Sequence, residues 1–245
     1  MRRDKSQGRL RMHAAFPTHN WHMVDLTLPL NAETPSPGLP APEIRLLRKH
    51  GDVFEDGLSF QMTWFGMNDH TGTHMDAPIH FVPGGLTIDE VDISSLFMMP
   101  GVCLDFTPGR PYQALDEASA RRALEAVGLT PADVPAGAFI LLHTGHDRHA
   151  GTPAYFDAPF LTPDCVAFLA SLAPRAIGVN APTVDDRRTS ERPIHRAILE
   201  RNIAIIEGVA NTEPLVGRRF FCTALPLRLT GCTGSPVRAV ALVEE

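Results

Sequence analysis

The sequence predicts a single α/β domain with a mixed sheet and few helices. The segment GAFILLHTG at 137–145 is a continuous apolar run bounded by glycines, which is typical of a strand buried on both faces. Several shorter segments alternate apolar and polar residues, as half-buried strands do. Only three segments carry a helical pattern, and 22 prolines in 245 residues favour turns over long helices.

The first part of the chain is expected to be rich in antiparallel strands. WHMVDLTLPL, which begins at residue 21, alternates and is rich in β-formers, so it predicts a first strand. The following NAETPSPGLPAPE contains four prolines and is predicted to be a loop. Residues 43–50 and 58–67 predict two further strands, and another is expected near 101–107.

The second part of the chain interleaves helix and strand patterns. ALDEASARRALEAVG has helical periodicity with acidic residues in its first turn. A second helix is predicted to open at Thr162-Pro163-Asp164, and a third spans 193–200 with proline at an early position, where its missing N–H is harmless. Further strands are predicted for RAIGVN at 175–180, IAIIEGV at 203–209, LPLRL at 225–229 and VRAVALV at 237–243.

Composition excludes several classes of protein. Twenty-two basic against 28 acidic residues give a net charge of −6, which argues against nucleic-acid binding. The four cysteines show no CxxC spacing, so neither a disulfide scaffold nor a thiolate zinc finger is expected. No stretch approaches the ~18 apolar residues of a membrane span. We expect a flexible, basic tail at 1–20 without the apolar run of a signal peptide, a single domain at 21–245, and a cytoplasmic location.

Histidines gather in one short segment. His70, His74 and His80 lie within HTGTHMDAPIH, so three of the eleven histidines fall in eleven residues. Imidazole and carboxylate are preferred ligands of zinc, manganese and iron. His74 and Asp76 are two apart, so in an extended segment both side chains project to one side. Glycine and proline make one continuous helix improbable, and a folded loop that gathers these side chains is expected.

Other donors are needed, because catalytic metal sites commonly use three or more protein ligands. His195 lies on a predicted helix with an apolar face. Glu207 follows an apolar strand, where a buried carboxylate is costly unless it is paired or binds metal. A strand-end carboxylate in solvent is an equally good interpretation of Glu207. The remaining candidate donors are His143, His146, His149 and Asp185.

HTGTHMDAPIHF resembles the HxGTHxDxPxH signature of the cyclase family of metal-dependent hydrolases, which includes bacterial kynurenine formamidases and isatin hydrolases. The similarity continues through VDLTLPL, HFVPGGLTIDEVDISSL, FILLHTG, AIGVNAPTVD and GCTGSPVRAVALV, and so covers nearly the whole chain. The resemblance implies a swivelling β/β/α fold, a homodimer or homotetramer, and one or two divalent ions, Zn²⁺ or Mn²⁺.

The resemblance also implies roles for individual residues. His70, His74 and Asp76 would bind the first ion. In members with two ions, Asp76 would bridge to the second, His195 would bind the second, and Glu207 would bind both.

Three features of the sequence bear on the substrate. Trp64, Phe65 and Phe81 flank the signature and are predicted to form an apolar wall for an aromatic ring, although core packing explains each one alone equally well. The family commonly has LLRTGW where this chain has LLHTGH at 141–146, and an acid where this chain has Asn180. These departures are expected near the substrate. His149 is better explained as part of a loop, while His143 and His146 stay open.

The implied reaction is hydrolysis of an amide-type C–N bond by metal-activated water, with His80 as the proton shuttle. An aryl formamide such as N-formylkynurenine is the first expected substrate, and a cyclic amide such as isatin is the second. A metal-binding protein of the same fold without turnover is the third interpretation. The chain has no G-x-S-x-G elbow, so a serine-hydrolase route has no support.

Overall fold

A nine-stranded mixed sheet forms the centre of the computed structural model, which describes residues 21–34, 36, 40–53 and 57–244. The strands lie in the order β1 (Trp21–Asp25), β13 (Val240–Glu244), β11 (Phe220–Thr223), β5 (Met99–Asp105), β7 (Phe139–His143), β9 (Ala176–Val179), β10 (Ala204–Glu207), β4 (His74–Asp76) and β12 (Gly234–Pro236). The four strands β5, β7, β9 and β10 are parallel, and the pairings on either side are antiparallel. The predicted α/β fold with a mixed sheet is confirmed.

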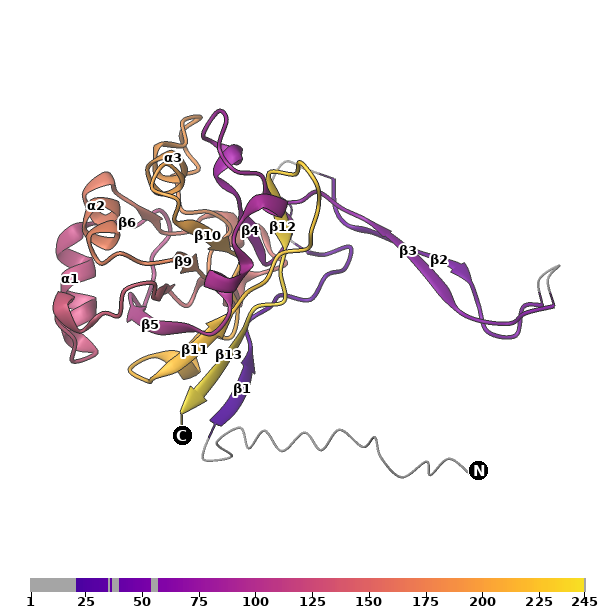
Figure 1. The fold of residues 1–245 in the computed structure, drawn as a ribbon, viewed down its shortest axis with the longest axis horizontal. Helices are drawn as coiled ribbons and strands as arrows, with labels where there is room; N and C mark the ends of the chain where they lie inside the picture. Colours follow the sequence, from indigo (N-terminus) through magenta and orange to yellow (C-terminus); the bar gives the residue numbers. More distant parts are fainter. Residues whose placement is uncertain (1–20, 35, 37–39, 54–56, 245) are drawn as a thin grey trace, which may run out of the picture.

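Three helices pack on one face of this sheet (Figure 1): α1 (Glu117–Ala126), α2 (Pro163–Ser171) and α3 (Pro193–Leu199). All three predicted helices are therefore present. The Asp116 carboxylate caps α1 by accepting a hydrogen bond from the Ser119 N–H, and α2 and α3 begin at prolines. None of the helices in the described ranges is long and apolar enough to cross a membrane. Single 3-10 turns lie at Pro78–His80, Ile88–Glu90, Ile93–Leu96, Pro131–Asp133, His146–His149, Pro153–Phe156 and Glu213–Leu215.

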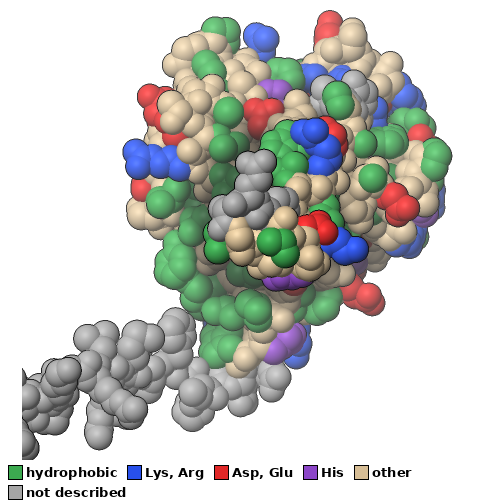
Figure 2. Space-filling model, turned by 90° about the vertical axis from the view of Figure 1, so that its right-hand side faces the viewer, with side chains coloured by type: hydrophobic (Ala, Val, Ile, Leu, Met, Phe, Trp, Pro, Cys, Tyr) green, Lys and Arg blue, Asp and Glu red, His purple; other side chains and the backbone are tan. Residues whose placement is uncertain are grey.

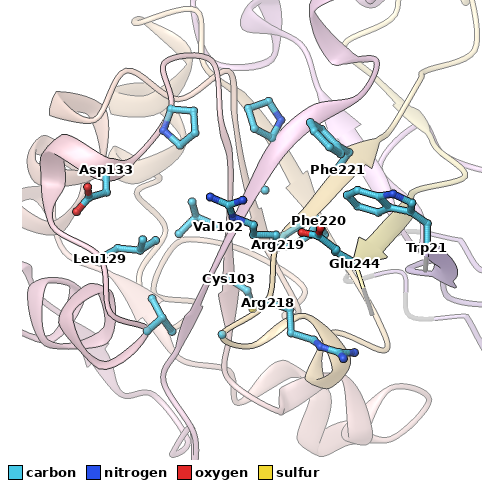
Figure 3. A pocket seen from close by; sticks show the side chains of 15 residues that line it. Trp21, Val102, Cys103, Leu129, Asp133, Arg218, Arg219, Phe220, Phe221 and Glu244 are labelled. Atoms are coloured by element: carbon cyan, nitrogen blue, oxygen red, sulfur yellow. The ribbon is translucent and has the colours of Figure 1, made fainter. Parts of the chain in front are cut away.

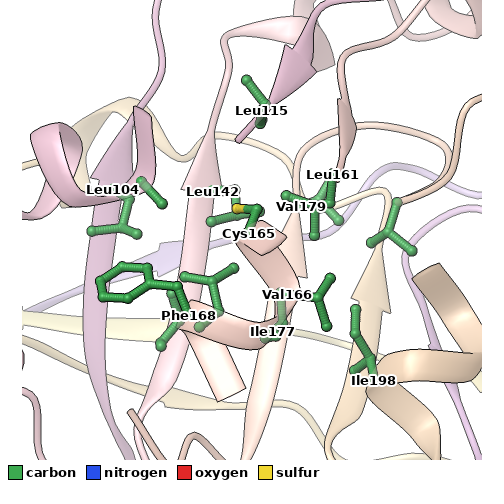
Figure 4. Packing of buried hydrophobic residues seen from close by; sticks show 14 of the residues in the cluster. Leu104, Leu115, Leu142, Leu161, Cys165, Val166, Phe168, Ile177, Val179 and Ile198 are labelled. Carbon is green, nitrogen blue, oxygen red and sulfur yellow. The ribbon is translucent and has the colours of Figure 1, made fainter. Parts of the chain in front are cut away.

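The apolar run of β7 is buried because both faces of the sheet are covered. Leu142 packs under the helices (Figure 4), as does Ile140, whereas Phe139 and Leu141 face a second core cluster behind the sheet. Alternate side chains of a strand point to opposite faces, so each strand supplies both clusters. Full burial of one such side chain contributes about 1.5–3 kcal/mol, which makes these clusters the main source of stability.

A separate two-stranded hairpin of β2 (Glu43–Arg48) and β3 (Met62–Gly66) projects away from the sheet (Figure 1). Its apolar side chains are exposed, with 54% for Leu46 and 61% for Phe65. The face from which the hairpin projects shows hydrophobic side chains interspersed with charged ones (Figure 2). A second small sheet pairs β6 (Ala114–Leu115) with β8 (Phe160–Leu161).

Two sequence expectations differ from the structure. LPLRL is not a strand: it holds only an isolated bridge from Pro226 to Val237, and the strand lies earlier, at Phe220–Thr223. Proline lacks the N–H that a ladder needs, so the pairing cannot continue through Pro226. The histidine-rich segment is not wholly a loop, because its centre is strand β4 and its end is a 3-10 turn at Pro78–His80. The predicted tail at 1–20 lies outside the described residues.

Candidate metal centre

The register of β4 against β10 brings three of the predicted ligands to one face of the sheet. His74 pairs with Glu207, and Asp76 pairs with Ile205. Met75 between them packs in the cluster behind the sheet, while Ile205 packs under the helices. The side chains of His74, Asp76 and Glu207 therefore project toward the helices. His74 Nε2 lies 3.4 Å from Asp76 Oδ1 and 3.6 Å from Glu207 Oε2, and all three residues are buried.

His70 reaches the same point from the loop before β4. Its Nδ1 lies 2.7 Å from Asp76 Oδ1, and its Nε2 lies 2.8 Å from Thr233 Oγ1. Gly234 leaves room for the ring, because a Cβ at that position would lie 2.6 Å from His70 Cε1. Thr233 and Gly234 also donate to the Asp69 carboxylate, so the GCTGSPV segment fixes this side of the site.

Helix α3 supplies His195 from above the sheet. His195 Nε2 lies 3.3 Å from Asp76 Oδ2 and 3.1 Å from Glu207 Oε1. Its Nδ1 lies 2.5 Å from Asp185 Oδ2, which leaves Nε2 facing the other two carboxylates. Glu207 is held in turn by the Val184 N–H, which donates to Oε1 over 2.9 Å. Glu207 is buried and paired, so the interpretation as a solvated strand end is wrong.

These donors fit a divalent cation. Donor atoms of His74, Asp76 and Glu207 lie within 4.8 Å of one another, and so do those of His70, Asp76 and His80. Asp76 Oδ2 is buried and accepts no hydrogen bond within the part of the chain that the structure describes. A buried carboxylate oxygen without a donor is costly, and a cation satisfies it. Imidazole and carboxylate suit Zn²⁺ and Mn²⁺ alike.

Charges in the centre shift the proton affinities of its ligands. Burial alone would lower the pKa of His74, but hydrogen bonding and attraction from Asp76, with attraction from Glu207, raise it to about 9. Burial likewise opposes the increase at His195, whose pKa is held well above its usual range by Glu207, Asp185 and Asp76. A cation must displace these protons, because metals bind neutral imidazole.

His80 occupies a different electrostatic position at the edge of the centre. Its ring stacks on His70 with 3.9 Å between centroids and lies 6.0 Å from the ring of His195. Burial lowers the pKa of His80 to about 4, and repulsion from His70 and His195 acts in the same direction against the attraction of Asp76. The ring is therefore neutral at pH 7.

A cavity of about 430 Å³ opens over the centre. Phe81 lines it and lies 4.9 Å from the His195 ring between centroids, as an aromatic wall would. The lining residues that sequence reasoning missed include two arginines, Arg187 and Arg192. The available signal was three arginines within six residues just before the helix that carries His195. The complete lining is Asn68, Asp69, His70, His74, His80, Phe81, Pro182, Thr183, Arg187, Arg192, His195, Glu207 and Thr233.

Trp64 and Phe65 do not line this cavity. Both lie on β3 of the projecting hairpin, where Arg45 lies over the Trp64 ring at 4.1 Å. Phe65 instead lines a cavity of about 750 Å³ at the base of the hairpin, together with Leu28 and Val237. Of the three aromatic residues that the sequence predicts to form a wall, Phe81 alone therefore lines this cavity within one chain.

The residues that depart from the family pattern are buried beside the site but do not line its cavity. His143 Nδ1 lies 2.6 Å from Thr212 Oγ1, and the Asn180 amide donates to Asp147 Oδ1 and accepts from the Thr144 N–H. Neither His143 nor Asn180 lines the cavity, although Pro182 and Thr183, close to Asn180 in the chain, do. Their hydrogen bonds instead fix the loops that follow β7 and β9.

His146 and His149 lie in the turn after β7. His146 is buried, and its Nε2 lies 2.9 Å from the Tyr155 carbonyl oxygen. Neither histidine lines the cavity, so neither is placed as a ligand.

Another cavity, of about 580 Å³, opens between the β1–β13–β11–β5 side of the sheet and the loops near Leu129 and Asp133 (Figure 3). Among the described residues that line this cavity, Cys103 is the one buried nucleophile. Burial raises the pKa of its thiol, which keeps the thiol protonated. The lining contains no group of histidines and carboxylates comparable to the metal centre among its described residues.

Comparison with known proteins agrees with the geometry. Residues 24–186 match the family described as putative cyclase. The chain is 30% identical over 194 residues to a kynurenine formamidase of Salinibacter ruber, covering 76% of this chain and 82% of the relative. It is 29% identical over 249 residues to an isatin hydrolase of Roseibium aggregatum, covering 91% and 92%.

A solved isatin hydrolase bound to the product analogue thioisatinate superimposes with a TM-score of 0.79 at 26% identity, covering 92% of this chain and 94% of that chain. The names of these relatives agree with the hydrolase class that the sequence predicts. A family match over more than half of the residues, supported by this fold, establishes that the chain belongs to the putative cyclase family.

Proposed function

We propose that the chain is a metal-dependent hydrolase that cleaves the C–N bond of an amide, with an aryl formamide such as N-formylkynurenine as its substrate. One observation carries the proposal: two carboxylates, Asp76 and Glu207, are buried among histidines beneath an open cavity, with a neutral histidine at its edge. The 30% identity to a kynurenine formamidase favours the formamide over other amides.

Each residue of the centre has a task in this reaction. A bound divalent ion supplies Lewis acidity and makes water a nucleophile near pH 7. His70, His74 and Asp76 would hold one ion, while His195 with Asp76 and Glu207 would hold a second. His80 takes the proton of the attacking water on a ring nitrogen and delivers it to the departing nitrogen, which suits an imidazole that is neutral at pH 7.

Hydrolysis of a cyclic amide such as isatin is the second candidate. It is favoured by the isatin hydrolases that match most of the chain in sequence and in structure. Both reactions use the same attack on a carbonyl carbon, so the metal centre does not separate them. Residues that line the cavity separate them, because they contact the part of the substrate that is not cleaved.

We further propose that the chain assembles as a homodimer through the β2–β3 hairpin. An isolated two-stranded hairpin is marginally stable in water, so it needs a surface to cover it. Ile44, Leu46, Leu47 and Phe65 are each more than half exposed. A second copy of the chain would cover these side chains in a closed two-fold arrangement. Trp64 and Phe65 could then contact a substrate only in the partner's cavity.

The test combines metal analysis with turnover. Protein purified without chelator is loaded with Zn²⁺ or Mn²⁺, and bound metal is measured per chain. N-formylkynurenine, isatin and simple cyclic amides are then assayed with each metal. We expect at least one ion per chain and metal-dependent release of formate from N-formylkynurenine. Metal binding without turnover of any amide would support the non-catalytic interpretation, and less than one ion per chain would contradict the site itself.

A further inference from the structure

Two arginines stand beside the candidate metal centre without a carboxylate partner in the part of the chain that the structure describes. Arg187 and Arg192 both line the cavity of about 430 Å³ that contains His80 and Glu207. Arg192 Nη1 donates to the Thr189 and Glu191 carbonyl oxygens, and its charge attracts the Asp186 carboxylate without a direct ion pair among the described residues.

Arg187 is the less satisfied of the two. Its Nη1 is buried and has no hydrogen-bond partner in the described part of the chain. Its guanidinium carbon lies 4.5 Å from the centre of the Phe156 ring, which holds the group in place through a cation–π contact. Burial lowers the pKa of Arg187 and repulsion from Arg192 adds to the effect, against attraction from Asp157 and Glu207, yet a guanidinium stays charged in proteins.

A buried guanidinium nitrogen without a hydrogen-bond partner costs free energy in the unliganded protein. The neighbouring Arg188 shows the usual arrangement, because its guanidinium pairs with the Asp186 carboxylate at 2.7 Å and lines another cavity. Arg187, unlike Arg188, therefore has a guanidinium nitrogen available to bind the anionic group of a ligand.

We propose that Arg187, supported by the charge of Arg192, binds a carboxylate on the part of the substrate that is not cleaved. The planar guanidinium matches a carboxylate with two parallel hydrogen bonds. This inference rests on the proposed function and narrows it: the substrate is an amide whose uncleaved part is a carboxylic acid. N-formylkynurenine has such a group, and isatin has none, so Arg187 favours the formamide.

The size of the cavity agrees with this class of ligand. A volume of about 430 Å³ lies within the range of ~300–1,000 Å³ that is typical of small-molecule sites. Phe81 faces the same cavity and offers an apolar surface to a ring. A carboxylate at Arg187 would orient such a substrate, because one end is fixed while its amide lies at the metal centre.

The test uses two aryl amides that differ only in the carboxylate: N-formylanthranilate and formanilide. Arg187→Gln removes the charge, Arg187→Lys keeps it without the paired donors, and Arg188→Gln is the matched control on the neighbouring, ion-paired arginine. For the zinc-loaded protein, Arg187→Gln is expected to raise KM for N-formylanthranilate about 10- to 100-fold. KM for formanilide should stay within about twofold, Arg187→Lys should recover part of the loss, and Arg188→Gln should behave as wild type.

A binding measurement separates this inference from the proposed function. Anthranilate is titrated calorimetrically into the full chain before and after zinc loading. We expect Arg187→Gln to weaken binding about tenfold or more in both states, while Arg188→Gln leaves it unchanged. Unaltered anthranilate affinity in Arg187→Gln would overturn the inference, as would equal loss of turnover with both amides. If wild type cleaves neither of these amides nor N-formylkynurenine nor isatin, the proposed function fails, and the titration still decides the role of Arg187.

Discussion

Asp185 Oδ2 lies 2.5 Å from His195 Nδ1, and the same carboxylate accepts hydrogen bonds from the backbone N–H groups of Ile194 and His195. One acid therefore fixes both the first turn of α3 and the ring that α3 presents to the centre. With Nδ1 engaged, Nε2 is the nitrogen left to face Asp76 and Glu207.

Asp185→Asn is expected to weaken the binding of the second ion about 10- to 100-fold, because a carboxylate that orients a ligating histidine also raises its basicity. Competition with a fluorescent zinc chelator measures the affinity. Asp186→Asn is the control, since Asp186 pairs with the surface residue Arg188. Equal zinc affinity in wild type and Asp185→Asn would show that α3 packing alone orients His195.

His80→Ala is expected to keep the metal and lose turnover. The His80 ring stacks on His70 at the edge of the centre, and loss of a general acid–base typically costs about 10²- to 10⁴-fold in rate. Metal content by elemental analysis and kcat with N-formylkynurenine are measured on the same preparation. Full turnover with bound metal would remove the proton-shuttle role, whereas loss of both metal and turnover would make His80 a ligand.

His146 gives a prediction about stability and pH. Burial lowers its pKa in the folded chain below the ordinary value near 6.5, so the unfolded chain binds a proton more readily. The contribution of this residue to stability is therefore complete above about pH 6.5 and is lost as the pH falls toward the lowered folded pKa.

Replacement of His146 with glutamine removes this proton uptake while keeping an N–H donor for the Tyr155 carbonyl oxygen. Urea unfolding between pH 7.5 and 5, in excess chelator, is expected to show a smaller loss of stability for His146→Gln than for wild type. His149→Gln, in the same turn, is the control. If the free energy of unfolding falls with pH equally in wild type and His146→Gln, protonation of His146 does not contribute to the loss of stability.

The hairpin gives a prediction about assembly. Leu46→Asp places a charge on an apolar surface that the proposed dimer buries, and should convert dimers to monomers in light scattering coupled to size exclusion. Ile93→Asp is the control, because Ile93 is 55% exposed but lies on a 3-10 turn of the body. A wild-type chain that is monomeric at micromolar concentration would end the dimer proposal before any substitution is made.

The sequence predicted much of the fold because local patterns carry it. Alternation predicted β1, apolar continuity predicted β7, and a proline at an early position marked the starts of α2 and α3. The prediction of a strand at LPLRL was wrong. Its composition suits a strand, but Pro226 has no N–H to donate to a neighbouring strand. The hairpin shows another limit, since its strands were predicted but their projection away from the sheet was not.

The spacing of His74 and Asp76 determined by itself that both face one side, because the side-chain period of a strand is two. Tertiary structure alone decided what they meet. Antiparallel pairing set Glu207 opposite His74, and the packing of α3 brought His195 to Asp76 from 119 positions further along the chain. The same packing set Arg187 beside the cavity without a carboxylate partner among the described residues. A lack of partners depends on every neighbour in space, so no local pattern in the sequence can reveal it.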